Sequence, residues 1–292
     1  IAEHSFTQVF NYSNDHISTN ITSYLHKVAN LEVFGISIEQ DKSITYSNDF
    51  ALLFNDVLSE MSNSPIHFQD CYPRIIGITN DQENKSVKTS MQHNQSAEKN
   101  INFIRSANPN KKIVAIQLKT SIITKDIPYI VLRDLIALLK ENTHYFPLLL
   151  IAPFEEERLF ARRLNKEFGE TLVIVEADLN AAASVLSNCD LLVGADTVIK
   201  HIGDNLKTKI IEVSLGPAPF LKQGPYSNGN LVLTDIIDKR TFTIKGHQAS
   251  SFRTRINAEN IFSTISYALY GEELNIPKGI TLYQASYDEF GM

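Results

Sequence analysis

Residues 190–201 of this 292-residue chain read Asp-Leu-Leu-Val-Gly-Ala-Asp-Thr-Val-Ile-Lys-His, and this stretch decides the fold that the sequence predicts. The run 190–193 indicates a short buried strand, which Gly194 ends. Asp196 and Thr197 are residue types that cap helices, so a short helix is expected from residue 196 onward. A strand followed directly by a helix is the repeating unit of a parallel sheet covered by helices.

The same alternation continues on both sides of this stretch. Short apolar runs predict strands at 113–118, 148–152, 172–175, 190–193 and 209–215. Amphipathic helices are expected between the strands; in one of them Phe160, Leu164 and Phe168 share one face. The C-terminal half is therefore predicted to be an α/β, Rossmann-like domain with a parallel sheet and helices on both faces.

The sequence before residue 111 has a different character. Residues 80–110 are rich in Asn, Gln, Ser and Lys, which is typical of a polar linker. Residues 1–79 are expected to form a partial N-terminal α/β domain, and residues 111–292 the C-terminal domain. Because the chain starts at Ile1 rather than Met, we expect residues upstream of it and an incomplete N-terminal domain.

Composition excludes several functional classes. The chain carries 27 basic and 33 acidic residues, a net charge of −6, so no general affinity for nucleic acid is expected. The longest apolar run, Phe146–Ala152, is too short to span a bilayer. Cys71 and Cys189 form no metal-binding spacing and favour a reduced, cytoplasmic protein.

Ligands of open parallel sheets bind beyond the carboxyl ends of the strands, so the residues that follow each strand are candidates for a site. The richest of these segments is 194–201, where the helix that begins near Asp196 offers free N–H groups to an anion. His201 lies one turn inside that helix, and Lys119, Lys125 and Lys200 offer positive charge to a phosphate. The same residues also fit a structural role, in which Asp196 only caps the helix and His201 only packs.

Several well-defined motifs are absent from the sequence. There is no GxGxxG dinucleotide fingerprint and no GxxxxGK[ST] phosphate loop. HExxH and GxSxG are also missing, so neither a metal site nor an α/β-hydrolase is predicted.

The C-terminal half resembles glycosyltransferase family nine, the heptosyltransferase-like enzymes of the GT-B fold that act in lipopolysaccharide assembly. Residues 190–201 look like the family's strand followed by Gly, any residue, Asp-Thr-Gly-Pro, any residue and His. Leu215-Gly216-Pro217 is similar to its Phe-Gly-Pro element. The resemblance implies that Asp196, Thr197, His201, Gly216 and Pro217 bind the nucleotide-sugar donor.

Two further segments carry the resemblance upstream. Lys125-Asp-Ile-Pro128 looks like the family's Lys, Arg or His, Trp, Pro segment, which implies a phosphate contact for Lys125. Glu155, or Glu156 one residue later, falls near the acid that holds the nucleoside ribose. The resemblance covers residues 111–292 well and residues 6–77 weakly.

The resemblance implies two Rossmann-like domains of the GT-B type, the N-terminal one incomplete. It implies metal-independent, inverting transfer of a sugar from a nucleotide-sugar, ADP-linked in our expectation, to a lipopolysaccharide or other glycan or glycolipid acceptor. No other cofactor, no metal and no nucleic-acid partner are expected. The expected location is the cytoplasm, with peripheral contact at the inner membrane face. No residue is assigned as the catalytic base.

The chain also departs from the family pattern. Val198 and Ile199 stand where the family has Gly-Pro, which places β-branched bulk at the diphosphate. The family's opening strand, which carries its catalytic aspartate, has no visible counterpart. Two alternatives therefore stay open: a catalytically silent GT-B-like protein that acts as a binding or scaffold subunit, and a different α/β enzyme acting on nucleotides.

Overall fold

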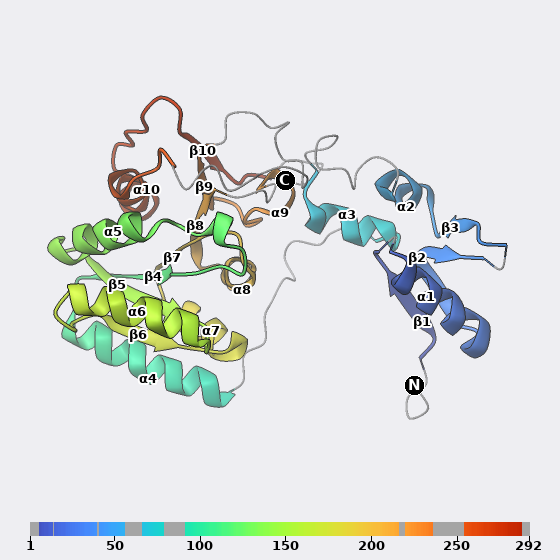
Figure 1. The fold of residues 1–292 in the computed structure, drawn as a ribbon, viewed down its shortest axis with the longest axis horizontal. Helices are drawn as coiled ribbons and strands as arrows, with labels where there is room; N and C mark the ends of the chain where they lie inside the picture. Colours follow the sequence, from blue (N-terminus) through green and yellow to red (C-terminus); the bar gives the residue numbers. More distant parts are fainter. Residues whose placement is uncertain are drawn as a thin grey trace. The chain divides into compact units, whose positions relative to one another are not determined.

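The computed structural model describes residues 6–13, 15–39, 41–55, 66–78, 91–215, 220–235 and 254–287 (Figure 1). These residues divide into two compact units. The first unit holds residues 6–78 together with 221–223, and the second holds the other described residues from 91 onward.

The second unit is built on a seven-stranded sheet. Its strands are β4 (Lys112–Gln117), β5 (Tyr145–Ile151), β6 (Val173–Glu176), β7 (Leu191–Gly194), β8 (Lys209–Ser214), β9 (Leu231–Thr234) and β10 (Thr281–Gln284). They lie in the order β10-β9-β8-β7-β4-β5-β6, and only β10 runs antiparallel to its neighbour. The predicted parallel sheet is confirmed. The order reverses between β4 and β7, which creates the crevice where such sheets bind ligands.

Helices cover both faces of this sheet, as predicted (Figure 1). They are α4 (Met91–Ala107), α5 (Tyr129–Glu141), α6 (Glu155–Glu167), α7 (Leu179–Leu186), α8 (Val198–Asn205) and α10 (Ala258–Tyr270). Residues Leu221–Gln223 of the short helix α9 (Phe220–Gln223) are assigned to the first unit. Along β4, Val114 and Ile116 face the core under α5, α6 and α10, whereas Ile113 and Ala115 face the core under α4, α7 and α8. A strand buried on both faces must be apolar at every position, which explains the continuous apolar runs in the sequence.

Helix α4 lies within the segment predicted as a polar linker. Its Ala97, Ile101 and Ile104 are buried in the core of the second unit, and Arg105 binds Asp190 at 3.0 Å. These apolar residues recur at helical spacing, one per turn, within an otherwise polar sequence. The polar composition of residues 80–110 outweighed these three apolar residues in the prediction of a linker. Residues 91–107 belong to the second unit.

The first unit is smaller. It contains β1 (Gln8–Asn11), α1 (His16–Ala29), β2 (Glu32–Ile38), β3 (Ile44–Tyr46), α2 (Asp49–Leu53) and α3 (Phe68–Ile75). The sheet order is β1-β2-β3, with β1 parallel to β2 and β3 antiparallel to it. Gly35 has φ +98°, and a Cβ there would lie 1.9 Å from the carbonyl oxygen of Asn11, so only glycine allows β1 and β2 to approach so closely.

No helix among the residues that the structure describes is both long and apolar enough to cross a bilayer.

Candidate functional site

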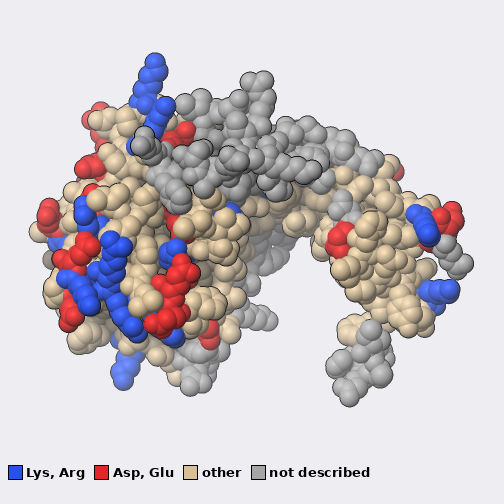
Figure 2. Space-filling view, viewed as in Figure 1, with Lys and Arg blue, Asp and Glu red and all other residues tan. Residues whose placement is uncertain are grey.

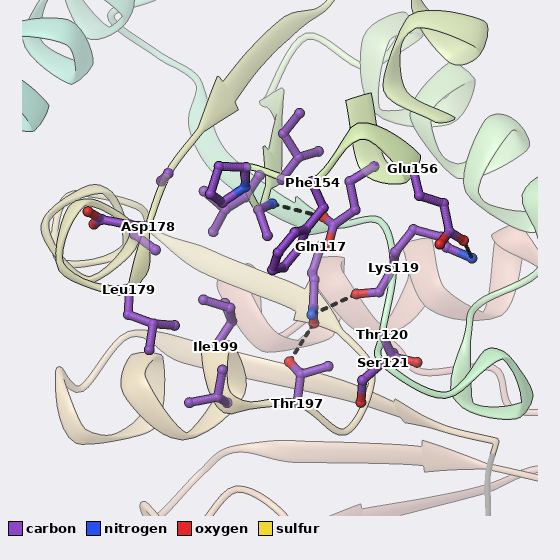
Figure 3. A pocket seen from close by; sticks show the side chains of 18 residues that line it. Gln117, Lys119, Thr120, Ser121, Phe154, Glu156, Asp178, Leu179, Thr197 and Ile199 are labelled. Carbon is purple, nitrogen blue, oxygen red and sulfur yellow. Dashed lines mark hydrogen bonds and ion pairs between the residues drawn. The ribbon is translucent and has the colours of Figure 1, made fainter. Parts of the chain in front are cut away.

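A cavity of about 680 Å³ opens in the second unit, beyond the carboxyl ends of β4, β5, β6 and β7 (Figure 3). It lies beside the β4–β7 reversal, and its volume suits a small-molecule ligand. Four chain connections supply its lining, which consists of Gln117, Lys119, Thr120, Ser121, Leu150, Ile151, Ala152, Pro153, Phe154, Glu156, Glu157, Ala177, Asp178, Leu179, Ala182, Thr197, Val198 and Ile199. In Figure 3, Asp178 and Leu179 lie on one side, Lys119 and Glu156 on the other, with Gln117 between them.

Gln117 joins the ends of β4 and β7. Its Oε1 accepts a hydrogen bond from Oγ1 of Thr197 at 2.9 Å, and its Nε2 donates to the carbonyl oxygen of Lys119 at 3.0 Å (Figure 3). A Cβ on Gly194 would lie 2.7 Å from Oε1 of Gln117. The glycine that ends β7 therefore makes room for the amide that fixes Thr197 at the cavity.

The first turn of α8 borders the cavity through Val198 and Ile199. Thr197 occupies the N-cap position, but its side chain makes no capping hydrogen bond to the helix. Its hydroxyl donates to Gln117 instead. The first N–H groups of a helix carry partial positive charge, so this end of α8 favours an anion at the cavity.

Behind this turn, four charged side chains form a row. Nζ of Lys125, in the short 3-10 helix Ile123–Lys125, lies 2.7 Å from Oδ2 of Asp196. Nζ of Lys200 lies 2.7 Å from Oδ1 of Asp196 and 2.9 Å from Oε2 of Glu212 on β8. We refer to Lys125, Asp196, Lys200 and Glu212 as the charge row.

Burial and pairing act in opposite directions on the pKa values in the charge row. Burial by itself would raise the pKa of Asp196, but Lys200 and Lys125 outweigh it and hold that pKa below its usual value. Burial would lower the pKa of Lys200, but Glu212 and Asp196 raise it above the ordinary value. For Glu212, burial dominates and raises the pKa, although Lys200 opposes it.

A second charged group lies on the other side of the cavity. Nζ of Lys119 is 2.6 Å from Oδ2 of Asp126 and 3.1 Å from Oε1 of Glu156. Burial would lower the pKa of Lys119, but both carboxylates raise it. Glu157 accepts the N–H of Ala152 at 2.9 Å, and its partial burial raises its pKa. This side therefore offers one paired cation and carboxylate oxygens that can accept hydrogen bonds.

The predicted site residues are distributed unevenly around this cavity. Thr197 lines it, and Lys125 and Asp196 belong to the charge row behind it. Glu155 begins α6, where it pairs with Arg158 and Arg162 at 3.5 Å; Glu156 lines the cavity instead. His201 is half-buried in α8 and does not line the cavity. Gly216 and Pro217 lie outside the described residues.

Sequence reasoning did not select two exposed apolar residues of the cavity. Phe154 and Leu179 are 64% and 52% exposed, although both are large apolar residues, and both line it. Each follows closely after the end of a strand, which is the signal that could have identified them. Asp178, which caps α7 through the N–H of Ala181, also lines the cavity.

The surface charge of the second unit is mixed. Figure 2 shows basic and acidic side chains interleaved on its visible face. Surface ion pairs of the second unit include Arg158 with Glu176 at 2.6 Å. Within the described part of the chain, no three His, Cys, Asp or Glu side chains are grouped as a metal site.

Comparison with known proteins adds a family assignment. Residues 67–243, which are 177 of the 292 residues, match the model of glycosyltransferase family 9 (heptosyltransferase). No curated protein matches the sequence at a significant level.

Two solved structures share the fold. A glycosyltransferase of family 9 from Veillonella parvula DSM 2008 aligns with a TM-score of 0.57 at 15% identity, over 72% of this chain and 61% of its own. The ADP-heptose lipopolysaccharide heptosyltransferase II of E. coli aligns with a TM-score of 0.53 at 14% identity, over 71% and 62%. The alignments thus span about three fifths of the length of either structure.

Proposed function

The chain belongs to glycosyltransferase family 9, and on that premise we propose that it transfers a sugar from a nucleotide-sugar donor to a hydroxyl of a glycan or glycolipid acceptor. One observation carries this proposal. The cavity of the second unit combines exposed apolar side chains, carboxylates and the first turn of a helix at the reversal of the strand order. Apolar side chains suit the base of a nucleoside diphosphate, carboxylates suit its ribose hydroxyls, and the first turn of a helix suits its diphosphate.

The nucleoside half of the donor fits the side of the cavity formed by Phe154, Leu179 and Asp178. An aromatic ring that stays 64% exposed offers a surface on which a base can stack. The carboxylate of Asp178, which also lines this side, can accept hydrogen bonds from ribose hydroxyls. We choose ADP as the first nucleotide to test, because the E. coli structure with the shared fold is named for ADP-heptose.

The diphosphate fits the opposite side, at the first turn of α8. Partial positive charge from the helix N–H groups and the ammonium of Lys125 would stabilise the negative charge that develops on the leaving diphosphate. The acceptor hydroxyl attacks the anomeric carbon, the bond to the diphosphate breaks, and the hydroxyl proton passes to a base that we do not assign. The proposed reaction is metal-independent and inverts the anomeric carbon.

The acceptor that we propose is a lipopolysaccharide or related glycan. A glycolipid acceptor would place the protein in the cytoplasm at the inner face of the membrane.

One observation favours a second candidate, a catalytically silent GT-B-like protein that acts as a binding or scaffold subunit. Val198 is half exposed in the first turn of α8, and Ile199 follows it at the cavity. Two β-branched side chains at this turn restrict the approach of a diphosphate to the helix N–H groups.

Thermal unfolding with ADP, UDP and GDP tests the binding step. A nucleotide at 100 times its Kd stabilises the folded state by about 2.7 kcal/mol. We expect one of the three to raise the Tm, and we expect Phe154→Ala to weaken that nucleotide about tenfold or more, since base stacking contributes about 1–3 kcal/mol. Phe103→Ala is the matched control, because Phe103 is 77% exposed on α4 and does not line the cavity.

The absence of any Tm shift with all three nucleotides would contradict the proposal. If a nucleotide binds, the two candidates are distinguished by whether the protein releases that nucleoside diphosphate from the corresponding nucleotide-sugar. A transferase releases it faster in the presence of acceptor, whereas a binding protein does not release it.

A further inference from the structure

All four residues of the charge row lie outside the lining of the cavity, and Lys200 and Glu212 are the most deeply buried of them. Their side chains are 1% and 0% exposed. Two ionisable groups buried this deeply incur a large desolvation cost, which pairing with each other only partly offsets. Apolar residues of similar size would fill the same space at lower cost, so this pair calls for a role other than packing.

The hydrogen bonds of Glu212 are also incomplete. Its Oε2 lies 2.9 Å from Nζ of Lys200, whereas its Oε1 is buried and has no hydrogen-bond partner among the described residues. An ionised carboxylate with a bare buried oxygen is strongly disfavoured, whereas a protonated one leaves a neutral group there. The geometry of Glu212 thus fits a carboxyl group that can hold a proton.

The protonation state of Glu212 sets the net charge of the row. Lys125 and Lys200 contribute two positive charges and Asp196 contributes one negative charge. With Glu212 ionised, the four groups sum to zero; with Glu212 protonated, they sum to +1. An anion that binds at Lys125 therefore meets a different field in the two states.

We propose that Lys200 and Glu212 are positioning residues for the diphosphate of the donor. Lys200 binds Oδ1 of Asp196 from the protein interior and offsets the negative charge of that carboxylate. The positive charge of Lys125, which binds Oδ2 of the same carboxylate, is then not fully neutralised and acts on the ligand. Glu212 sets how much of that charge remains. This inference rests on the proposed function, because it takes the ligand of Lys125 to be a phosphate group.

Among the described residues, the charged groups that act on Glu212 come from one face of the sheet. Lys200 from α8, Asp196 from the connection before α8, and Lys125 all act on it. The neighbouring strands place uncharged residues beside it in register, Gly194 on β7 and Val232 on β9. Helix α10 packs on the opposite face with Ile211 and Val213, so it brings no charge to Glu212.

The test compares the wild-type protein with Glu212→Gln, which keeps the shape of the side chain but fixes its charge at zero. The Kd of the nucleoside diphosphate identified by thermal unfolding is measured from pH 5 to pH 9 in both proteins. The phosphates of the ligand titrate equally in both, so their effect cancels in the ratio of the two Kd values. We expect the wild-type Kd to equal that of Glu212→Gln at low pH and to exceed it by about tenfold at high pH.

Glu259→Gln is the matched control. Glu259 is exposed in the first turn of α10, so this variant has the same change in net charge away from the row. We expect its ratio to wild type to stay near one at every pH. A ratio for Glu212→Gln that does not change between pH 5 and pH 9 would overturn the inference.

A second readout separates this inference from the proposed function. Because burial raises the pKa of Glu212 in the folded state, the stability that Glu212 contributes is present at low pH and is lost as the pH rises through that pKa. The free energy of unfolding of the wild type should therefore fall relative to Glu212→Gln across the same range. Failure of the wild type to bind any nucleotide would contradict the proposed function, and an unchanged stability difference would still overturn the role of Glu212.

Discussion

The two sides of the cavity differ in how they meet solvent. The side toward α8 is supported by charged groups that are paired and buried, with Asp196 held between Lys125 and Lys200. The side toward α6 and α7 also holds the ion pair of Lys119 and Asp126, but it presents Phe154 and Leu179, which are apolar and exposed. Paired buried charges keep fixed positions without a ligand, whereas exposed apolar side chains gain their contacts only when a ligand covers them. We infer that the first side orients the ligand and the second supplies affinity.

The largest expected effect comes from breaking the charge row. Lys200→Met leaves Asp196 with one partner fewer and removes the ammonium beside Glu212, and we expect the free energy of unfolding to fall by about 3–5 kcal/mol. Urea denaturation measures this loss. Lys200→Met combined with Glu212→Leu should recover most of it, and a double variant as unstable as the single one would show that the pair does not act as a unit.

A smaller effect is expected where β4 and β7 meet. In Gly194→Ala the new methyl group would stand 2.7 Å from Oε1 of Gln117 and displace that amide from Thr197. Overpacking of this kind costs about 1–3 kcal/mol, and nucleotide binding should weaken with it. Gln117→Ala in the Gly194→Ala background removes the clash. A double-mutant cycle should therefore show favourable coupling; additive losses would argue against the clash.

Val198→Gly makes the α8 side of the cavity more open. Removing a half-exposed β-branched side chain from the first turn should bring the diphosphate closer to the helix N–H groups and lower the nucleotide Kd by about three- to tenfold. Calorimetric titration measures the change. Leu179→Gly, at the first turn of α7, is the comparison on the apolar side and should raise the Kd. A lower Kd in both variants would mean that general crowding, not diphosphate approach, limits binding.

The smallest expected effect is the pH dependence from Glu157. Its pKa is raised by partial burial, so the stability that it contributes is present below its unfolded value of about 4.3 and is lost as the pH rises through the folded pKa. The stability of the wild type relative to Glu157→Gln should fall as the pH rises from 4 through the folded pKa. Thermal unfolding at a series of pH values checks this, and a rise instead of a fall would contradict the direction.

The fold was largely predictable from the sequence. Each strand of the parallel sheet is a short apolar run, and in each helix that follows a strand the apolar residues recur at helical spacing. The residues of 190–201 form β7 and the start of α8 as predicted, and the family indicated by this stretch is confirmed. Helix α4 escaped prediction, because its buried Ala97, Ile101 and Ile104 are outnumbered by polar residues.

The site was predictable only in part. Thr197, Lys125 and Asp196 could be selected because they follow strands or match a motif, and the structure places them at the cavity or just behind it. The residues Gln117, Phe154 and Glu212 carry no motif. Their significance depends on which strands lie side by side.

The alternation of strands and helices, the parallel sheet and the family follow from the sequence alone, because they depend on periodicity and on residues close together in the chain. The tertiary structure alone decided that β4 lies beside β7, which brings Gln117 to Thr197 across 80 positions of sequence. It also decided that Lys125 and Lys200 share Asp196 and that Oε1 of Glu212 is buried without a hydrogen-bond partner in the described part of the chain. Such pairings depend on distances between segments far apart in the chain, which local sequence patterns do not encode.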